Sequence, residues 1–175
     1  SRVWVDLHHR PGRKLPGTWE LVETAPGELA CVHSARANAV IAAALAKGLI
    51  GPLAAYPQIR REVCLNPGGS RFDFLLGGAQ GSCVVEVKSV TLALGEGEGA
   101  FPDAVSVRGQ KHLRELTELA QAGQPACLLF CVMHSGIDRV RPADEIDPLY
   151  GQLLREARAA GVLVLAWSVR PTPQG

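Results

Sequence analysis

The sequence predicts an α/β fold, more specifically an α+β fold, in which helices pack on the faces of a mixed sheet with both parallel and antiparallel strands. Helix-type and strand-type segments alternate in the order α-β-β-β-α-β-α-β after an amino-terminal stretch of strands and turns. The chain has 175 residues, of which 47% are hydrophobic and 20% charged, so it can bury a sizeable core without disulfide bonds or a structural metal.

The amino-terminal stretch carries two strand patterns. Residues 3–7 have the period-two pattern of a strand, and residues 18–23 have a second one. A basic turn with a Pro-Gly pair separates them, and it contains Arg13 and Lys14. Because two strands alone are only marginally stable, we expect this stretch to be part of a larger unit.

Three segments carry the signals of helices: residues 37–47, 107–122 and 148–160. The first is rich in Ala and Leu, the second has one apolar stripe, and a glycine follows each of the three. Asp147 and Pro148 open the third segment as an N-cap residue and a proline at the first helical position.

Five further segments have strand patterns: residues 59–65, 71–76, 83–90, 126–133 and 162–169. Within the second of these, Phe72, Phe74 and Leu76 are predicted to share one face. A short Gly-rich turn joins the second segment to the third, so these two are expected to pair as an antiparallel hairpin. Residues 94–99, which are mostly Gly and Glu, are predicted to form a loop.

Charge, hydropathy and cysteine content limit the function classes. A formal net charge of +1 excludes a polycation that coats nucleic acid by charge alone, so any nucleic-acid site must be local. No apolar run approaches the roughly 20 residues that span a bilayer, and we expect no signal peptide. The cysteines include no CxxC pair, which argues against a zinc site, and Cys64, Cys83, Cys127 and Cys131 lie inside apolar, strand-like runs. We therefore expect them to be buried thiols in a reducing cytoplasm.

Charged residues lie inside two of the apolar strands. Asp73 is in residues 71–76, while Glu86 and Lys88 are two positions apart in residues 83–90 and so share a face. Such charges are costly to bury unless they are paired or bind a metal. An Asp beside a Glu offers oxygen ligands that suit Mg²⁺ or Mn²⁺, and a lysine there can orient a water or neutralise developing charge. The alternative is an exposed edge strand that carries a charge pair.

The spacing from Asp73 to the Glu86-Val87-Lys88 segment, with the order α-β-β-β-α-β, resembles the core of the PD-(D/E)xK nuclease superfamily. The resemblance implies a restriction-endonuclease-like core with Mg²⁺ or Mn²⁺ as the cofactor. It also implies that Asp73 and Glu86 are metal ligands and catalytic residues, and that catalytic Lys88 assists the attacking water. The backbone carbonyl of Val87 would be a further metal ligand.

Longer segments resemble the sugar fermentation stimulation protein A family over nearly the whole chain. They are residues 14–16, 18–23, 70–76, 86–92, 101–105, 108–116 and 141–148. The resemblance implies an amino-terminal OB-fold, which is a five-stranded β-barrel, followed by a nuclease-like domain. It also implies DNA binding and nuclease activity on DNA or RNA.

The chain departs from the family pattern at its start and at two glutamate positions. The resemblance begins partway into the OB-fold, so we expect residues 1–30 to be the carboxyl-terminal remnant of an OB-fold β-barrel. Residues 31–175 are then expected to form the PD-(D/E)xK nuclease-like domain. Ala43 and Val107 stand where the family has glutamates. Since the helix glutamate is an additional metal ligand in related nucleases, its loss favours binding without turnover.

Basic residues gather at the start of the second predicted helix and in the amino-terminal turn. They are predicted to contact the phosphates of a nucleic acid. The predicted contacts are Arg108, Lys111, His112, Arg114, Arg13 and Lys14. The alternative for the helical residues is an ordinary solvated helix face.

The sequence thus predicts a cytoplasmic, DNA-binding, metal-dependent phosphodiesterase that acts on DNA or RNA. The alternative is a non-catalytic protein of the same fold, which binds DNA non-specifically and regulates sugar metabolism. The expected partner is nucleic acid, with no membrane and with a homodimer left open.

Overall fold

A five-stranded mixed sheet forms the centre of the computed structural model, which describes residues 1–7 and 15–173. In sheet order its strands are β11 (Leu163–Ser168), β9 (Ala126–Val132), β6 (Gly81–Val90), β5 (Arg71–Gly78) and β4 (Gln58–Cys64). β6, β9 and β11 run parallel, whereas β4, β5 and β6 are antiparallel neighbours. The predicted mixed α+β class and the predicted hairpin of β5 and β6 are both confirmed.

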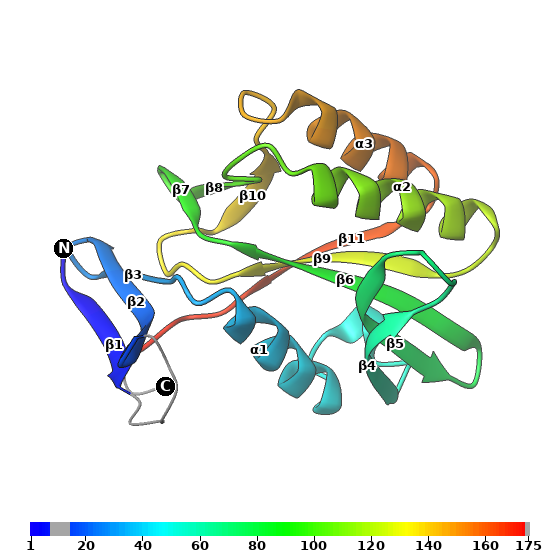
Figure 1. Cartoon of the computed structure of the whole chain (residues 1–175), viewed down its shortest axis with the longest axis horizontal. Helices are drawn as coiled ribbons and strands as arrows, with labels where there is room; N and C mark the ends of the chain where they lie inside the picture. Colours follow the sequence, from blue (N-terminus) through cyan, green and yellow to red (C-terminus); the bar gives the residue numbers. More distant parts are fainter. Residues whose placement is uncertain (8–14, 174–175) are drawn as a thin grey trace.

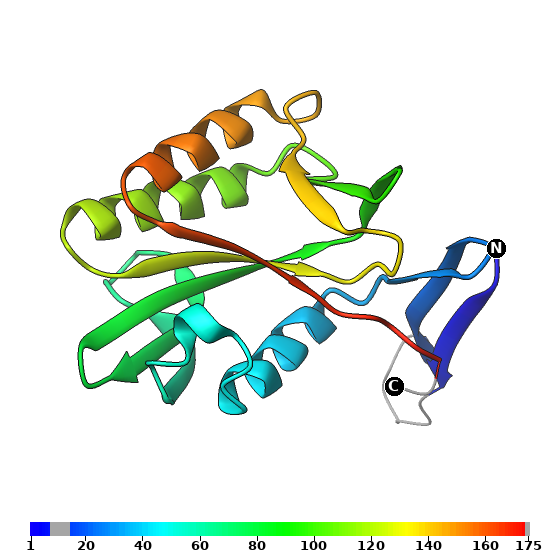
Figure 2. The ribbon, with the colours of Figure 1, turned by 180° about the vertical axis from the view of Figure 1, so that it is seen from behind.

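Helices cover both faces of this sheet (Figure 1). α1 (Ala35–Ala46) lies on one face, and α2 (Val107–Gln121) and α3 (Pro148–Ala159) lie side by side on the other, as Figure 2 also shows from behind. Because neighbouring strand residues point to opposite faces, β6 contributes Val85 to the core under α1 and Val84 to the core under α2 and α3. The three predicted helices are confirmed, and a short 3₁₀ helix (Gly51–Leu53) follows α1.

A separate antiparallel sheet is built from the amino-terminal strands β1 (Val3–Leu7), β2 (Gly17–Ala25) and β3 (Glu28–Cys31). The segment that follows β11 runs back toward this sheet (Figure 1). Backbone bonds from Cys31 N to Met133 O and from Ser135 N to Leu29 O join it to the main body. The domain boundary expected between residues 30 and 31 therefore falls inside a strand that is bonded to both parts.

A third small sheet corrects the loop predicted at residues 94–99. β7 (Leu92–Gly95) and β8 (Glu98–Phe101) form a hairpin there, and β10 (Arg139–Pro142) pairs with β8 in parallel. The Gly-rich residues that suggested a loop make the tight turn of this hairpin, with positive φ at Gly95, Glu96 and Gly97.

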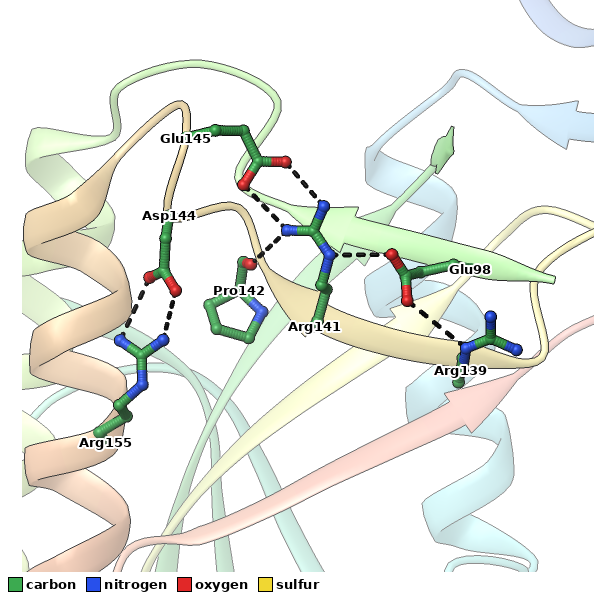
Figure 3. Close-up of polar contacts among 7 residues, drawn as sticks. All are labelled: Glu98, Arg139, Arg141, Pro142, Asp144, Glu145 and Arg155. Carbon is green, nitrogen blue, oxygen red and sulfur yellow. Dashed lines mark hydrogen bonds and ion pairs between the residues drawn. The ribbon is translucent and has the colours of Figure 1, made fainter. Parts of the chain in front are cut away.

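Ion pairs join β8 and β10 to the segment that leads into α3 (Figure 3). Arg141 of β10 donates to Glu98 of β8 at 2.9 Å and to both carboxylate oxygens of Glu145. Arg155 of α3 pairs with Asp144. These pairs are partly exposed, so each contributes little to stability.

Two predictions about individual side chains are wrong. Cys64 is exposed because β4 is the edge strand of the central sheet, whereas Cys83, Cys127 and Cys131 are buried as expected. Phe72 packs in the core beneath α2, and Phe74 packs in the core beneath α1. The regular alternation of β5 breaks between them, beside Glu62 of β4, which has a φ of 53°.

The N-cap prediction for the third helix is confirmed. The Asp147 carboxylate accepts a hydrogen bond from the backbone N–H of Tyr150, and Pro148 occupies the first turn. In the part of the chain that the structure describes, no helix is long and apolar enough to cross a membrane.

Candidate functional site

Asp73 lies where β5 separates from β6. The paired positions of the two strands end at Phe74 and Val85. Beyond that point the Asp73 side chain bridges the strands, because its Oδ2 accepts a hydrogen bond from the backbone N–H of Val87 at 2.8 Å. Its Oδ1 accepts from Asn38 Nδ2 of α1 at 2.6 Å. The carboxylate is thus held from a strand and a helix at once.

Glu86 is buried on the α2 side of β6, with only 3% of its surface exposed. Two donors converge on its Oε1: the Lys88 ammonium at 2.7 Å and the Nδ1 of His112 from α2. Its Oε2 is buried and has no hydrogen-bond partner. A buried polar atom without a partner is rare in folded proteins and calls for an explanation, such as a bound ion or water.

The pKa values of the two carboxyls move in opposite directions. Burial raises the pKa of Asp73, the Glu86 charge raises it further, and bonds from Val87 and Asn38 only partly offset the rise. Burial also disfavours ionised Glu86, but the hydrogen bond from His112 and the charge of Lys88 outweigh it and hold the Glu86 pKa below its usual value. The charge of Glu86 therefore acts on Asp73 across two neighbouring strands.

These residues fit a hard divalent cation. Carboxylate and carbonyl oxygens are the ligands of Mg²⁺ and Mn²⁺, and Glu86 Oε2 is an oxygen that the protein leaves unused. Within residues 1–7 and 15–173, no group of three His, Cys, Asp or Glu side chains gathers as a metal site. The candidate centre therefore consists of two carboxylates, Asp73 and Glu86, to which the Val87 carbonyl can be added.

A basic hollow of about 510 Å³ opens beside His112, the residue that contacts Glu86. We use this name for the depression lined by Ser70, Arg71, Val107, Arg108, Lys111 and His112. Arg71 comes from the start of β5, whereas Arg108 and Lys111 come from the first turns of α2. His112 belongs both to the hollow and to the group around Glu86, so it connects the two.

The structure separates the residues predicted to contact nucleic acid. Arg108, Lys111 and Arg114 are exposed on α2. His112 is only 1% exposed, and its Nδ1 is already bonded to Glu86, so its polar contact lies in the protein interior. The remaining predicted contacts, Arg13 and Lys14, lie outside the described residues.

The sequence pattern did not identify two residues of the site. Asn38 is the α1 side chain that contacts Asp73, and the signal for it was a polar residue next to the buried Ala37. Arg71 contributes a cation to the basic hollow from the residue before Phe72. In contrast, Ala43, where a helix glutamate was expected by resemblance, is exposed on α1 while Ala44 is buried.

Together, the fold and the site define a mixed α+β protein with a buried carboxylate–lysine–histidine group next to a basic hollow. The model of the SfsA family, described as the sugar fermentation stimulation protein RE domain, matches residues 35–175. The chain therefore belongs to the sugar fermentation stimulation protein family.

Relatives in this family are similar along the whole chain. The sugar fermentation stimulation protein homolog of Pseudomonas aeruginosa (strain LESB58) is 54% identical over 175 residues, which cover 99% of this chain and 74% of that protein. The homolog of Ectopseudomonas mendocina (strain ymp) is 51% identical with the same coverage. A solved structure, that of Pyrococcus furiosus SfsA in complex with Ca²⁺, matches with a TM-score of 0.84 and 28% identity, over 95% of this chain and 69% of that one.

Proposed function

We propose that this protein is a metal-dependent nuclease, which hydrolyses phosphodiester bonds in DNA or RNA. The observation that carries the proposal is the unpartnered, buried Oε2 of Glu86, whose other oxygen is bonded to Lys88, on the strand that neighbours the strand of Asp73. The resemblance of these residues to the PD-(D/E)xK pattern supports it. The central sheet with α1, α2 and α3 fits a restriction-endonuclease-like core, and the sheet β1-β2-β3 fits part of an OB-fold.

Mg²⁺ or Mn²⁺ would be held by Asp73, by Glu86 through Oε2 and by the Val87 carbonyl. The related P. furiosus protein was solved with Ca²⁺, which also takes oxygen ligands. When bound, the ion supplies Lewis-acid stabilisation of the negative charge that develops on the phosphate.

Lys88 would act on the attacking water and on the phosphate. Its ammonium carries three N–H donors, of which one is used by Glu86 at 2.7 Å. The lysine side chain is only 13% exposed, so its charge acts in surroundings where water screens it weakly. A cation placed in this way stabilises negative charge in the transition state.

The nucleic acid would enter through the basic hollow. Arg71, Arg108 and Lys111 present cations around it, and Arg114 extends the basic surface along α2. Such contacts hold the phosphate backbone without reading the base sequence. The proposed substrate is therefore a nucleic acid that is bound by its backbone.

The second candidate is a DNA-binding regulatory protein of sugar metabolism that does not cleave. One observation favours it: the Lys88 ammonium is paired with Glu86 at 2.7 Å, so its charge is already partly neutralised before any substrate binds. In this case the basic hollow would bind phosphates, and the carboxylates would have a structural role.

A cleavage assay separates the two candidates. End-labelled single-stranded and duplex DNA and RNA are incubated with the protein in Mg²⁺, Mn²⁺ or EDTA, alongside Asp73→Ala, Lys88→Ala and the control Arg158→Gln at the end of α3. We expect metal-dependent cleavage by the wild type and the control, with a loss in both site variants. Cleavage that persists in Asp73→Ala and Lys88→Ala would exclude this site. Salt-sensitive DNA binding without any cleavage would favour the regulatory protein.

A further inference from the structure

We infer that His112 is a positioning residue, which holds Glu86 through Oε1 so that Lys88 can leave the carboxylate and turn to the substrate. This inference rests on the nuclease function proposed above. It assigns to His112 a role inside the protein in place of the direct phosphate contact expected from its sequence position.

The convergence of two donors on one oxygen is the first support. Lys88 Nζ and His112 Nδ1 both contact Glu86 Oε1, and the two nitrogen atoms are 3.3 Å apart. An ionised carboxylate only accepts hydrogen bonds, so we assign the proton of this contact to His112 Nδ1. If Lys88 left, the buried Oε1 would still have the histidine as a donor, and the cost of an unsatisfied buried charge would be avoided.

The rigidity of His112 is the second support. Its side chain is 2% exposed, and its ring lies 5.8 Å from that of Phe72. Its neighbour on α2, Leu113, is completely buried in the core. Lys88 in contrast has a long, flexible stem and more exposure, so it is the member of the group that can move.

Glu20 shows a different arrangement of a histidine and a cation around a carboxylate, whereas Glu115 shares one feature with Glu86, since its donors contact Oε1 and its Oε2 has no partner. Glu20 is also contacted by a histidine and a cation, but His33 Nδ1 bonds to its Oε1 at 2.9 Å and Arg36 Nε bonds to its Oε2 at 2.8 Å. Both oxygens of Glu20 are therefore satisfied. Glu86 instead has both donors on one oxygen, which leaves Oε2 available for a metal and makes one of the two donors dispensable.

The test measures Mn²⁺ binding and DNA cleavage in parallel for His112→Asn and His112→Phe. Asparagine places an N–H donor near the position of Nδ1, whereas phenylalanine keeps the ring volume and loses the donor. Matched controls are His33→Asn and His33→Phe, which make the same changes beside Glu20. Mn²⁺ affinity is measured by titration calorimetry, and thermal unfolding in EDTA reports the folded fraction of each variant.

We expect His112→Phe to weaken Mn²⁺ binding by about 10–100-fold, the usual effect of removing the residue that orients a metal ligand. His112→Asn should recover most of the affinity and cleavage, and both His33 variants should match the wild type. A purely structural role would lower the unfolding temperature of His112→Phe and leave the Mn²⁺ affinity of the folded protein unchanged, which would overturn the inference alone. Equal losses in His112→Asn and His112→Phe would overturn it too. A wild type that binds no Mn²⁺ would overturn both this inference and the nuclease function.

Discussion

The Oδ2 of Asp73 accepts a hydrogen bond from the backbone N–H of Val87, at the point where the strands that carry them stop pairing. The carboxylate thus takes the place of the next backbone acceptor along β5. This contact holds Asp73 beside the residue that follows Glu86, just beyond the last paired positions of the two strands. An acidic residue in such a position costs stability unless a cation compensates it.

Asp73→Asn should therefore stabilise the metal-free protein at neutral pH, because it removes the charge while the Asn38 amide can turn so that its Oδ1 accepts from the new side-chain N–H. Because the pKa of Asp73 is raised above 3.8, the folded state binds more protons than the unfolded state just above that pH. As the pH rises above 3.8, ionisation of Asp73 in the folded state lowers the free energy of unfolding. At pH 7 the carboxyl is ionised in both states, so the full destabilisation is present. We expect the free energy of unfolding to rise by about 0.5–2 kcal/mol at pH 7, which is the usual range for a single stabilising substitution.

Urea unfolding in EDTA checks this prediction at pH 7 and at pH 3.5. The difference between Asp73→Asn and the wild type should shrink at the lower pH, because most of the Asp73 carboxyls are then protonated in both states. A variant that is less stable than the wild type at pH 7 would show that Asp73 is not a destabilising group.

Asn38→Ala should destabilise the protein by removing the Nδ2 donor to Asp73 Oδ1. A hydrogen bond to a charged group contributes roughly 1.5–3 kcal/mol, and the partial exposure of Asp73 places the expected loss at the low end. Chemical denaturation measures the loss, and Mn²⁺ titration should show weaker binding. Ala43→Glu is the control on the same helix: its exposed position predicts unchanged Mn²⁺ affinity, and a tighter Mn²⁺ complex would contradict the placement of α1.

Lys111→Gln should weaken DNA binding and reduce its dependence on salt. Each phosphate contact that is lost lowers the slope of log affinity against log salt concentration by about 0.7–0.9. Fluorescence anisotropy at several salt concentrations measures this slope. Arg158→Gln, on the last turn of α3, removes the same charge away from the basic hollow and should leave the slope unchanged. Equal slopes for the wild type and Lys111→Gln would remove Lys111 from the interface.

Asp147→Ala should lower the free energy of unfolding by about 2–4 kcal/mol, since it removes a helix cap and leaves buried donors without partners. Asp147 is 2% exposed and accepts hydrogen bonds from Tyr150 N, Ser106 N and Gln110 Nε2, so it ties α3 to α2. The comparison is Asp144→Ala, which breaks a partly exposed pair with Arg155 and should cost at most about 1 kcal/mol. Similar losses of unfolding free energy for both variants, measured in urea, would mean that the hydrogen bonds of Asp147 stabilise the protein no more than an ordinary surface ion pair does.

The longer elements of the fold could be predicted from the sequence because their signals are local. Periodicity, glycine stops and the cap at Asp147 were enough for the helices and for the strands of the central sheet. The strands that were missed, β3, β7, β8 and β10, have four residues each. β10 exists as a strand because it pairs with β8, about 40 residues earlier in the chain, and no local pattern records such a pairing.

The candidate site was predictable only along the strands that carry it. The spacing of Asp73, Glu86 and Lys88 predicted a group of charges between β5 and β6. The contacts made by Asn38 and His112 depend on how α1 and α2 pack on opposite faces of the sheet. For this reason His112 was predicted to meet phosphates at the surface, whereas its Nδ1 contacts Glu86 in the interior.

The most direct test of the metal centre is the anomalous scattering of a crystal soaked in Mn²⁺. We predict a peak bonded to Glu86 Oε2 and to Asp73, at roughly the 2.0–2.2 Å expected for small divalent ions with oxygen ligands. The ion should be lost in a Glu86→Gln crystal. A crystal with no peak at this position, or with Mn²⁺ bound elsewhere while Glu86 Oε2 contacts only protein atoms, would contradict the proposed nuclease site.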